Sequence, residues 1–343
     1  MKQKRIIFID HIRALAILMV IMCHVIDVNC LFWLGYQEMS GARQIILYTL
    51  LIFGRCGVPL FLMITGYLLL DRDYSQGKWK SFYLHKWLHL FLLTEIWFII
   101  YEGFSVLVQG NSFVGKDLVM RLLFIKEPAL SHAWYLPVIL GLYLILPIVA
   151  QLLKWASDRK IALLIGMLLL VMICLQIWQK ERLAQHISYL VYTLIGYGLK
   201  IWRVNIRPEE YKKWRMICYV VCIGATVGCE TYLCLQHLKG QAVSLWYDNI
   251  YVMLLACAIF VMFSLCIEKS SPAIQYLSEV SFGIYLIHNM IALAMIEHLL
   301  YWDINLYIKI FVSYIGILVA SIVIEKLIEA IPMVGKWILY KKR

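Results

Sequence analysis

Four side chains in one apolar stretch near the N-terminus could do acid–base or anion-binding chemistry: Asp10, His11, Arg13 and His24. The stretch, FIDHIRALAILMVIMCHV, is otherwise typical of a membrane-spanning helix. In a helix, Asp10, Arg13 and His24 lie on one stripe. Arg13 and His24 are about 20° apart around the axis and roughly 16 Å apart along it. Charged groups inside a span are costly and point to a functional site. The plainer alternatives are an Asp10–Arg13 ion pair near the interface and an interhelical hydrogen bond from His24.

A second predicted span places a guanidinium in apolar sequence. The segment GRCGVPLFLMITGYLLL carries Arg55 beside Gly57 and Pro59. A helix interrupted by Gly and Pro exposes backbone groups, which a membrane tolerates only against protein or a water-filled cavity. We therefore expect a break in the helix here and a protein-facing Arg55.

Polar groups also mark the later spans. The segment SHAWYLPVILGLYLILP begins with His132, Trp134 and Tyr135; an aromatic belt at the outer interface accounts well for the two aromatic residues and less well for the histidine. Lys86 begins the third span, where its side chain could extend to the interface. Glu325 ends the last span, where we interpret it as an ordinary interface charge.

The segment SEVSFGIYLIHNM places three polar side chains on one helical stripe, because Ser281, Tyr285 and His288 follow an i, i+4, i+7 spacing. The predicted spans then sort the polar groups by depth. An inner layer holds Asp10, Arg13, Lys86, Ser281, Tyr285 and Glu325, and a middle-to-outer layer holds His24, Arg55 and His132.

The elements that must position these groups are membrane helices. Hydrophobic residues make up 63% of the 343 residues, charged residues 15%, and the mean hydropathy is +0.78. Apolar runs predict about ten transmembrane helices, near 6–29, 44–70, 84–108, 133–153, 161–178, 187–201, 216–236, 246–267, 280–298 and 307–325. We expect an all-α polytopic membrane protein with a single integral-membrane domain over residues 1–343. The first run is interpreted as a retained span, because Asp10 and Arg13 interrupt it and no signal-peptide cleavage site follows.

The distribution of Lys and Arg predicts the orientation. With the N-terminus in the cytoplasm, the inner segments hold 22 of these residues and the outer segments 8. This asymmetry favours both termini in the cytoplasm and an even number of spans. The net charge of +11 therefore indicates membrane topology, and no nucleic-acid partner is expected.

The ten cysteines predict no disulfide framework and no metal site. Most lie in or beside predicted spans, and none is spaced as C-x-x-C. Cys218 and Cys222 are one helical turn apart, yet they lack a supporting His or carboxylate. We interpret them as small apolar side chains.

In order along the chain, these motifs resemble those of the acyltransferase 3 family of integral-membrane O-acyltransferases. The first span matches an Asp-x-x-Arg pattern with a His eleven residues after the Arg, at Asp10, Arg13 and His24. RCGVPLFLMITGYLL, HAWYL and SFGIYLIH resemble the family's later motifs. The chain is similar to the single-module type that O-acetylates enterobacterial common antigen. At the start of its third span, where relatives often have Arg-rich sequence, this chain has LHKWLHL.

The resemblance implies acyl transfer from cytoplasmic acyl-CoA, commonly acetyl-CoA, to a hydroxyl of a cell-surface glycan or lipid-linked sugar. The protein would be a multi-pass protein of the inner (cytoplasmic) membrane, with acyl-CoA as a substrate and no permanently bound cofactor or metal. Arg13 and Lys86 would bind the CoA phosphates. Asp10 would hold Arg13, and Asp10, Ser281, Tyr285, His288 and Glu325 together would form a supporting polar network.

His24 would act as general base on the sugar hydroxyl, or become acylated and relay the group; the sequence leaves both open. Arg55 would stabilise the developing oxyanion. His132, Trp134 and Tyr135 would lie on the acceptor side. The acceptor sugar, its hydroxyl, the acyl group and the oligomeric state are not determined by the sequence.

Two other functions fit the same scaffold. Buried Arg and His residues also line the paths of glycan or lipid transporters, which usually show internal repeats. The membrane half of some membrane-bound serine racemases shares these motifs, so an amino-acid (serine) transport module is the second alternative.

Overall fold

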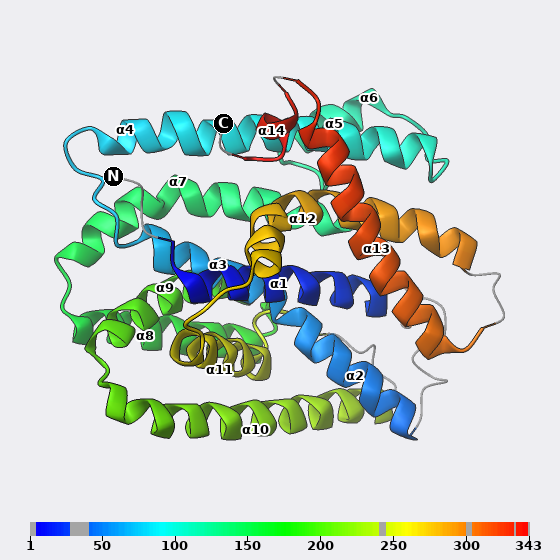
Figure 1. Cartoon of the computed structure of the whole chain (residues 1–343). Coiled ribbons are helices and arrows are strands. Elements are labelled where there is room, and N and C mark those ends of the chain that lie inside the picture. The colour runs from blue at the N-terminus through cyan, green and yellow to red at the C-terminus, as the bar shows by residue number, and fades with distance from the viewer. Residues whose placement is uncertain (1–4, 28–40, 240–244, 300–303, 333, 342–343) are drawn as a thin grey trace. The chain divides into compact units, whose positions relative to one another are not determined.

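The chain folds into helices throughout residues 5–27, 41–239, 245–299, 304–332 and 334–341, which are the residues that the computed structural model describes (Figure 1). Within these ranges there is no strand, and eight helical segments are long and apolar enough to cross a membrane. The predicted all-α, polytopic membrane fold is therefore confirmed. The orientation of the termini stays a prediction.

The described helices divide between two compact units. Unit 1 consists of Met1–Arg72 and Leu152–Ser281, and unit 2 of Asp73–Gln151 and Phe282–Arg343. Unit 1 contains α1 (Ile7–Ile26), α2 (Gly41–Arg55), α3 (Gly57–Leu69), α8 (Asp158–Ile177), α9 (Glu181–Asn205), the short 3₁₀ helix η5 (Pro208–Glu210), α10 (Tyr211–Leu238), α11 (Ile250–Cys266) and the start of α12 (Pro272–Leu299).

Helix α1 forms the core of unit 1, because it packs against α2, α3 and α11. Two thirds of its apolar window is buried, whereas only 11% of the corresponding window of α8 is buried. The less buried side of α1 carries Leu15, Leu18 and Met22, as the stripe on its opposite side predicts. A helix so enclosed by protein can keep polar side chains away from lipid.

Helices α3 and α9 approach each other at backbone distance. A Cβ atom on Gly66 would overlap the carbonyl oxygen of Thr193, and one on Gly196 would overlap that of Met63. Small residues of this kind allow membrane helices to pack closely, since lipid supplies no hydrophobic force to drive helices together. This contact fixes the distance between α3 and α9 inside unit 1.

Unit 2 contains long helices and several short helical turns. It contains α4 (Lys78–Phe82), the π-helix η3 (Tyr83–Trp87), α5 (Leu88–Leu107), α6 (Gly115–Leu122), the 3₁₀ helix η4 (Ser131–Trp134), α7 (Tyr135–Lys154), most of α12, α13 (Leu306–Glu329) and α14 (Gly335–Ile338). Helix α14 packs against α5 and α13.

The described helices cover all ten predicted spans, with differences that have local causes. The predicted span 187–201 lies in α9, which carries charged residues at both ends, and 246–267 matches α11, which has only 17 residues. Neither is among the eight segments, so a total of ten crossings stays a prediction. Residues 28 and 29 of the predicted first span lie outside the described residues.

Several helices begin at positions other than the predicted ones, and two of these starts have a local cause. Helix α11 begins at Ile250 because the Asn249 side chain caps it by accepting a hydrogen bond from the Tyr251 amide at 2.9 Å. Helix α12 begins at Pro272, eight residues before the predicted start at 280, since proline is well suited to the first turn of a helix. The expected break near Gly57 and Pro59 is confirmed at Cys56, between α2 and α3.

Candidate active site

The crossing of α1 with α2 and α3 brings His24 close to Arg55. A Cβ atom on Gly54 would lie 2.8 Å from the backbone nitrogen of Cys23. A Cβ on Gly57 would lie 2.6 Å from the carbonyl oxygen of Ala16. Because His24 follows Cys23 and Arg55 follows Gly54, both residues lie at this crossing.

The Arg55 guanidinium contacts three residues of unit 1, namely Asp27, Trp246 and the Tyr247 side chain. Its Nη2 donates to Asp27 Oδ2 at 2.9 Å, and its Cζ lies 5.2 Å from the centroid of the Trp246 ring. The Arg55 side chain is 14% exposed and that of Asp27 27%. Arg55 Nε is buried and has no hydrogen-bond partner in the described part of the chain. These contacts thus leave the Nε–H of the guanidinium available as a donor.

Trp246, whose ring contacts the Arg55 guanidinium, lies in the loop before α11. The Tyr192 hydroxyl donates to the Tyr247 carbonyl at 2.7 Å, and Gln176 Nε2 donates to both the carbonyl and the carboxylate of Asp248 at 2.9 and 3.0 Å. Burial raises the pKa of the Tyr247 phenol, so this phenol stays neutral beside Arg55. The loop is therefore anchored to α8 and α9.

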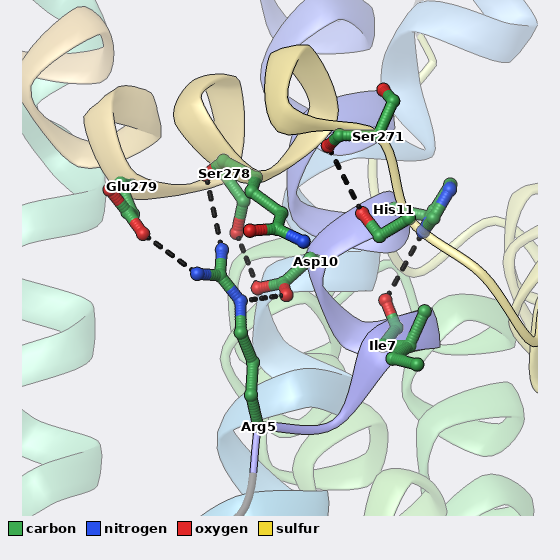
Figure 2. A network of polar contacts seen from close by, with 9 residues as sticks. Arg5, Ile7, Asp10, His11, Ser271, Ser278 and Glu279 are labelled. Carbon is green, nitrogen blue, oxygen red and sulfur yellow. Dashed lines mark hydrogen bonds and ion pairs between the residues drawn. The ribbon is translucent and has the colours of Figure 1, made fainter.

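A second polar network of unit 1 surrounds Asp10 (Figure 2). Its carboxylate accepts hydrogen bonds from Arg5 Nε and from Ser278 Oγ, the latter at 3.0 Å. Arg5 also reaches Glu279 at 2.8 Å and the Gln275 carbonyl at 3.3 Å. The bond to Asp10 raises the pKa of the Arg5 guanidinium. Asp10 thus joins the start of α1 to the start of α12, and the partners shown for it are Arg5 and Ser278, where the spacing predicted Arg13.

The other sequence-predicted residues of unit 1 lie on these same elements. Arg13 is half-buried on α1, between Asp10 and His24 along the helix. Ser281 is buried on α12 and donates to the Ser278 carbonyl at 2.8 Å, which places it beside the Asp10 network. Unit 1 therefore contains Asp10, Arg13, His24, Arg55 and Ser281.

In unit 2, His132 lies in a buried cluster of neutral groups. Asn289 Nδ2 lies 3.0 Å from His132 Nδ1, so the amide and the ring share a hydrogen bond. The Tyr285 hydroxyl donates to the His132 carbonyl at 2.8 Å, and the His132 and His288 rings are 5.3 Å apart. His288 Nδ1 lies 2.7 Å from the Tyr285 carbonyl, so its proton is on Nδ1. Both imidazoles are thus hydrogen-bonded through Nδ1 within one cluster.

This cluster corrects the predicted layering. Tyr285 was assigned to the inner layer and His132 to the outer one, yet the two are hydrogen-bonded. The reason is the early start of α12 at Pro272, which puts Tyr285 at mid-helix. Tyr135 is also buried, with its ring 5.5 Å from that of Tyr285, so an aromatic belt does not describe it. Trp134 lies beside Tyr135, 6.0 Å between ring centroids.

Lys86 belongs to the π-helix η3, a local widening of the helix that is often found at functional sites. Its Nζ lies 6.0 Å from the Tyr340 ring centroid, and the Tyr340 hydroxyl donates to the Lys86 carbonyl at 3.3 Å. Nearby, the His89 ring stacks on Trp337 at 4.7 Å. The C-terminal residues of unit 2 thus pack on the segment that carries Lys86.

Glu325 is fully buried, which the interpretation as an interface charge missed. Its carboxylate pairs with Lys341 Nζ, and a Cβ atom on Gly283 would lie 2.6 Å from its Cγ. The prediction failed because the chain after α13 turns back and returns Lys341 to this helix. A glycine on α12 leaves room for the buried carboxylate.

Several residues at these sites were not found from the sequence. Asp27 lies one helical turn after His24, so its spacing was a usable signal. Asn289 directly follows His288 in a quoted motif. No sequence signal marked Trp246 or Lys341, because loops bring them to their partners. Among the described residues, no group of three His, Cys, Asp or Glu side chains is arranged to hold a metal ion.

The fold and the two sites define a polytopic membrane protein with acid–base and cationic side chains on buried helix faces. The acyltransferase family model described as "Acyltransferase domain" matches residues 6–326. The chain therefore belongs to the acyltransferase 3 family, and it is a multi-pass membrane protein. The predicted membership of this family is confirmed.

A curated relative is described as an amino-acid racemase from Enterococcus faecalis. The two chains are 24% identical over 268 residues, which cover 71% of this chain and 36% of the relative. The match thus covers about a third of the relative's length. No solved structure matches the chain.

Proposed function

We propose that this acyltransferase moves an acyl group, specifically acetyl, from cytoplasmic acetyl-CoA to a hydroxyl of a cell-surface glycan or lipid-linked sugar. The observation that carries the proposal is the Arg55 guanidinium at the same helix crossing as His24, with its buried Nε left as an open donor. A buried donor without an acceptor costs about 1–3 kcal/mol, which a site recovers when a substrate oxygen binds there.

In this proposal His24 takes the proton of the acceptor hydroxyl as its oxygen attacks the thioester carbonyl. The carbon–oxygen bond forms, and negative charge develops on the former carbonyl oxygen, which Arg55 stabilises. The carbon–sulfur bond then breaks, and the proton passes from His24 to the departing CoA thiolate. In the relay variant, His24 itself is acylated and transfers the group to the hydroxyl in a second step.

Arg13 and Lys86 are the proposed anchors for the CoA phosphates. Arg13 lies on the stripe of α1 that carries His24, roughly 16 Å away along the helix. A long pantetheine arm would span this separation, so an anchored nucleotide and a thioester at His24 are compatible. The protein would then act in the cytoplasmic membrane, with the donor on the inner side and the glycan reached from the outer side.

A transfer assay tests this function. Membranes containing the protein are supplied with acetyl-CoA labelled in the acetyl group, and label is measured in extracted glycan and lipid-linked sugar. Wild-type protein should transfer label, and His24→Gln protein at equal folded amount should not. Trapping of an acetylated His24 in acceptor-free samples would select the relay variant. Transfer by His24→Gln protein at the wild-type rate would exclude the assignment of His24.

The similarity to the amino-acid racemase favours one second candidate, an amino-acid transport module on the same scaffold. Uptake of labelled serine into proteoliposomes separates the two functions. Serine uptake without acetyl transfer would support the second candidate.

A further inference from the structure

We infer that Asp27 and Trp246 are positioning residues for Arg55, holding its guanidinium so that the Nε–H points at the reacting oxygen. The inference rests on the proposed function, and it assigns a role to two residues outside its mechanism. Asp27 lies at the end of α1 and Trp246 in the loop before α11. They meet the guanidinium from two different elements of unit 1.

The Asp27 contact fixes one end of the guanidinium. The 2.9 Å bond to Nη2 is charge-assisted, and such bonds are short and directional. Asp27 Oδ2 also receives a weak hydrogen bond from Cys23 Sγ at 3.6 Å. The carboxylate is therefore held by α1 itself, one helical turn beyond His24, and it ties Arg55 to the helix that carries the proposed base.

The Trp246 contact fixes the plane of the guanidinium. A cation 5.2 Å from an indole centroid is attracted to the ring face. The Gln176 and Tyr192 bonds that anchor residues 247 and 248 hold this loop in place. With Nη2 on Asp27 and the Cζ over the indole ring, rotation of the guanidinium is restricted and Nε keeps one direction.

An ion pair kept only for stability would not explain this arrangement. Such a pair is most favourable when all buried donors of the guanidinium are satisfied. Here one donor is buried and left open, at the crossing where His24 lies. Preorganised donors that await a developing charge are a main source of enzymatic rate enhancement.

The test compares Asp27→Asn with Asp71→Asn in full-length protein. Asp71 also pairs with a cation of unit 1, Lys200, at 2.7 Å, and lies outside the proposed machinery. Asp27→Asn keeps the side-chain size and removes the charge. We expect kcat for acetyl transfer to fall about 10–100-fold with the KM for acetyl-CoA unchanged, whereas Asp71→Asn keeps both values.

Chemical rescue gives a second, independent readout. Arg55→Ala protein should lose transfer and recover part of it with added methylguanidinium, which would occupy the space between Asp27 and Trp246. The Arg55→Ala/Asp27→Asn double variant should recover no activity with methylguanidinium. The Arg55→Ala/Trp246→Leu double variant should recover less activity than Arg55→Ala alone. If the Asp27→Asn protein does not fold, Asp27→Glu takes its place, with a smaller fall in kcat at an unchanged KM.

The outcomes separate this inference from the proposed function. Wild-type kcat in the folded Asp27 variant, or equal rescue with and without Asp27, overturns the positioning role and leaves the function standing. A parallel fall in folded protein and activity at unchanged kcat per folded molecule also overturns it, because that result describes a stabilising pair. Full activity of Arg55→Ala protein would instead remove Arg55 from the mechanism.

Discussion

The histidines of the two units have different surroundings. His24 in unit 1 lies at a helix crossing beside the Arg55–Asp27 ion pair. His132 in unit 2 is held by neutral groups, the Asn289 amide on its ring and the Tyr285 hydroxyl on its carbonyl. A nearby cation favours negative charge on a reacting oxygen, whereas neutral hydrogen bonds fix a tautomer and a ring orientation.

The two units also differ in the contacts that pack their helices together. In unit 1, glycines allow backbones to approach, so short-range charge pairs form between helices. In unit 2, aromatic side chains donate to backbone carbonyls of other elements: Tyr83 to Leu144, Trp87 to Leu140, Trp97 to Ile338 and Tyr101 to Leu286. The proposed base and oxyanion donor, His24 and Arg55, lie in unit 1, whereas unit 2 holds the buried ion pairs Glu325–Lys341 and Glu102–Arg121.

The largest expected effect compares the two histidine sites directly. His24→Gln should lower acetyl transfer about 10²–10⁴-fold, the usual cost of losing a general base, while folding and acyl-CoA binding stay near wild type. His288→Gln should mainly lower the free energy of unfolding, because its Nδ1–H donates to a backbone carbonyl. Transfer rates and thermal unfolding of both variants are measured at equal folded amounts. A larger rate loss in the His288 variant would reverse the comparison.

The next effect concerns the buried charge in unit 2. Lys341→Met leaves the Glu325 carboxylate buried without its cation and should cost about 3–5 kcal/mol of stability. Lys326→Met is the matched control, since Lys326 also pairs with Glu329 but is 51% exposed, and should cost less than about 1 kcal/mol. Denaturant titration of both proteins in detergent provides the values. Equal losses would show that the Glu325 pair contributes no more than a surface pair.

Donor binding in unit 1 is expected to show an intermediate effect. Arg13→Ala should weaken acetyl-CoA binding by about 1.5–3 kcal/mol if a charge-assisted contact to phosphate is lost. Arg13→Lys should restore part of the affinity, because lysine keeps the charge without the bidentate geometry. Calorimetry with CoA on folded protein measures both. Wild-type affinity of the Arg13→Ala protein would make Arg13 a structural residue.

Close packing in unit 1 should be sensitive to a single methyl group. Gly66→Ala should destabilise the protein by about 1–3 kcal/mol or more, because the new Cβ overlaps the Thr193 carbonyl. Gly224→Ala on α10 is the control, since a Cβ there meets nothing within 4 Å, and it should be neutral or slightly stabilising. Thermal midpoints of the two variants decide the point; a tolerated Gly66→Ala would contradict the backbone contact.

The smallest effect is expected for an exposed pair of unit 2. Lys126 holds the pKa of the Asp117 carboxyl below its usual value. Its small stabilisation is therefore present above the unfolded pKa, near 4, and is lost as pH falls through the lower folded value. Asp117→Asn should leave the thermal midpoint nearly unchanged at pH 7, and the small remaining difference should shrink as the pH is lowered below the unfolded pKa. Glu102→Gln, which removes the buried partner of Arg121, should lower the midpoint visibly at pH 7.

The sequence by itself determined the membrane class, the helical fold and the family. Apolar runs long enough to span a bilayer leave few alternatives to helices, since lipid satisfies no backbone hydrogen bonds. The helical period also placed Asp10, Arg13 and His24 on one stripe of α1, and the glycine and proline near Arg55 predicted the break at Cys56. These features depend on local sequence.

Only the tertiary structure decided which side chains meet. Asp10 pairs with Ser278 and Tyr285 with His132, and both pairs lie far apart in sequence. Asp10 also pairs with nearby Arg5, and Glu325 with Lys341 after the chain turns back beyond α13. Trp246 reaches Arg55 through a loop whose end is set by the Asn249 cap. Helix periodicity fixes the direction of a side chain around its own axis, but the partner on another helix depends on crossings that glycines and loop returns define.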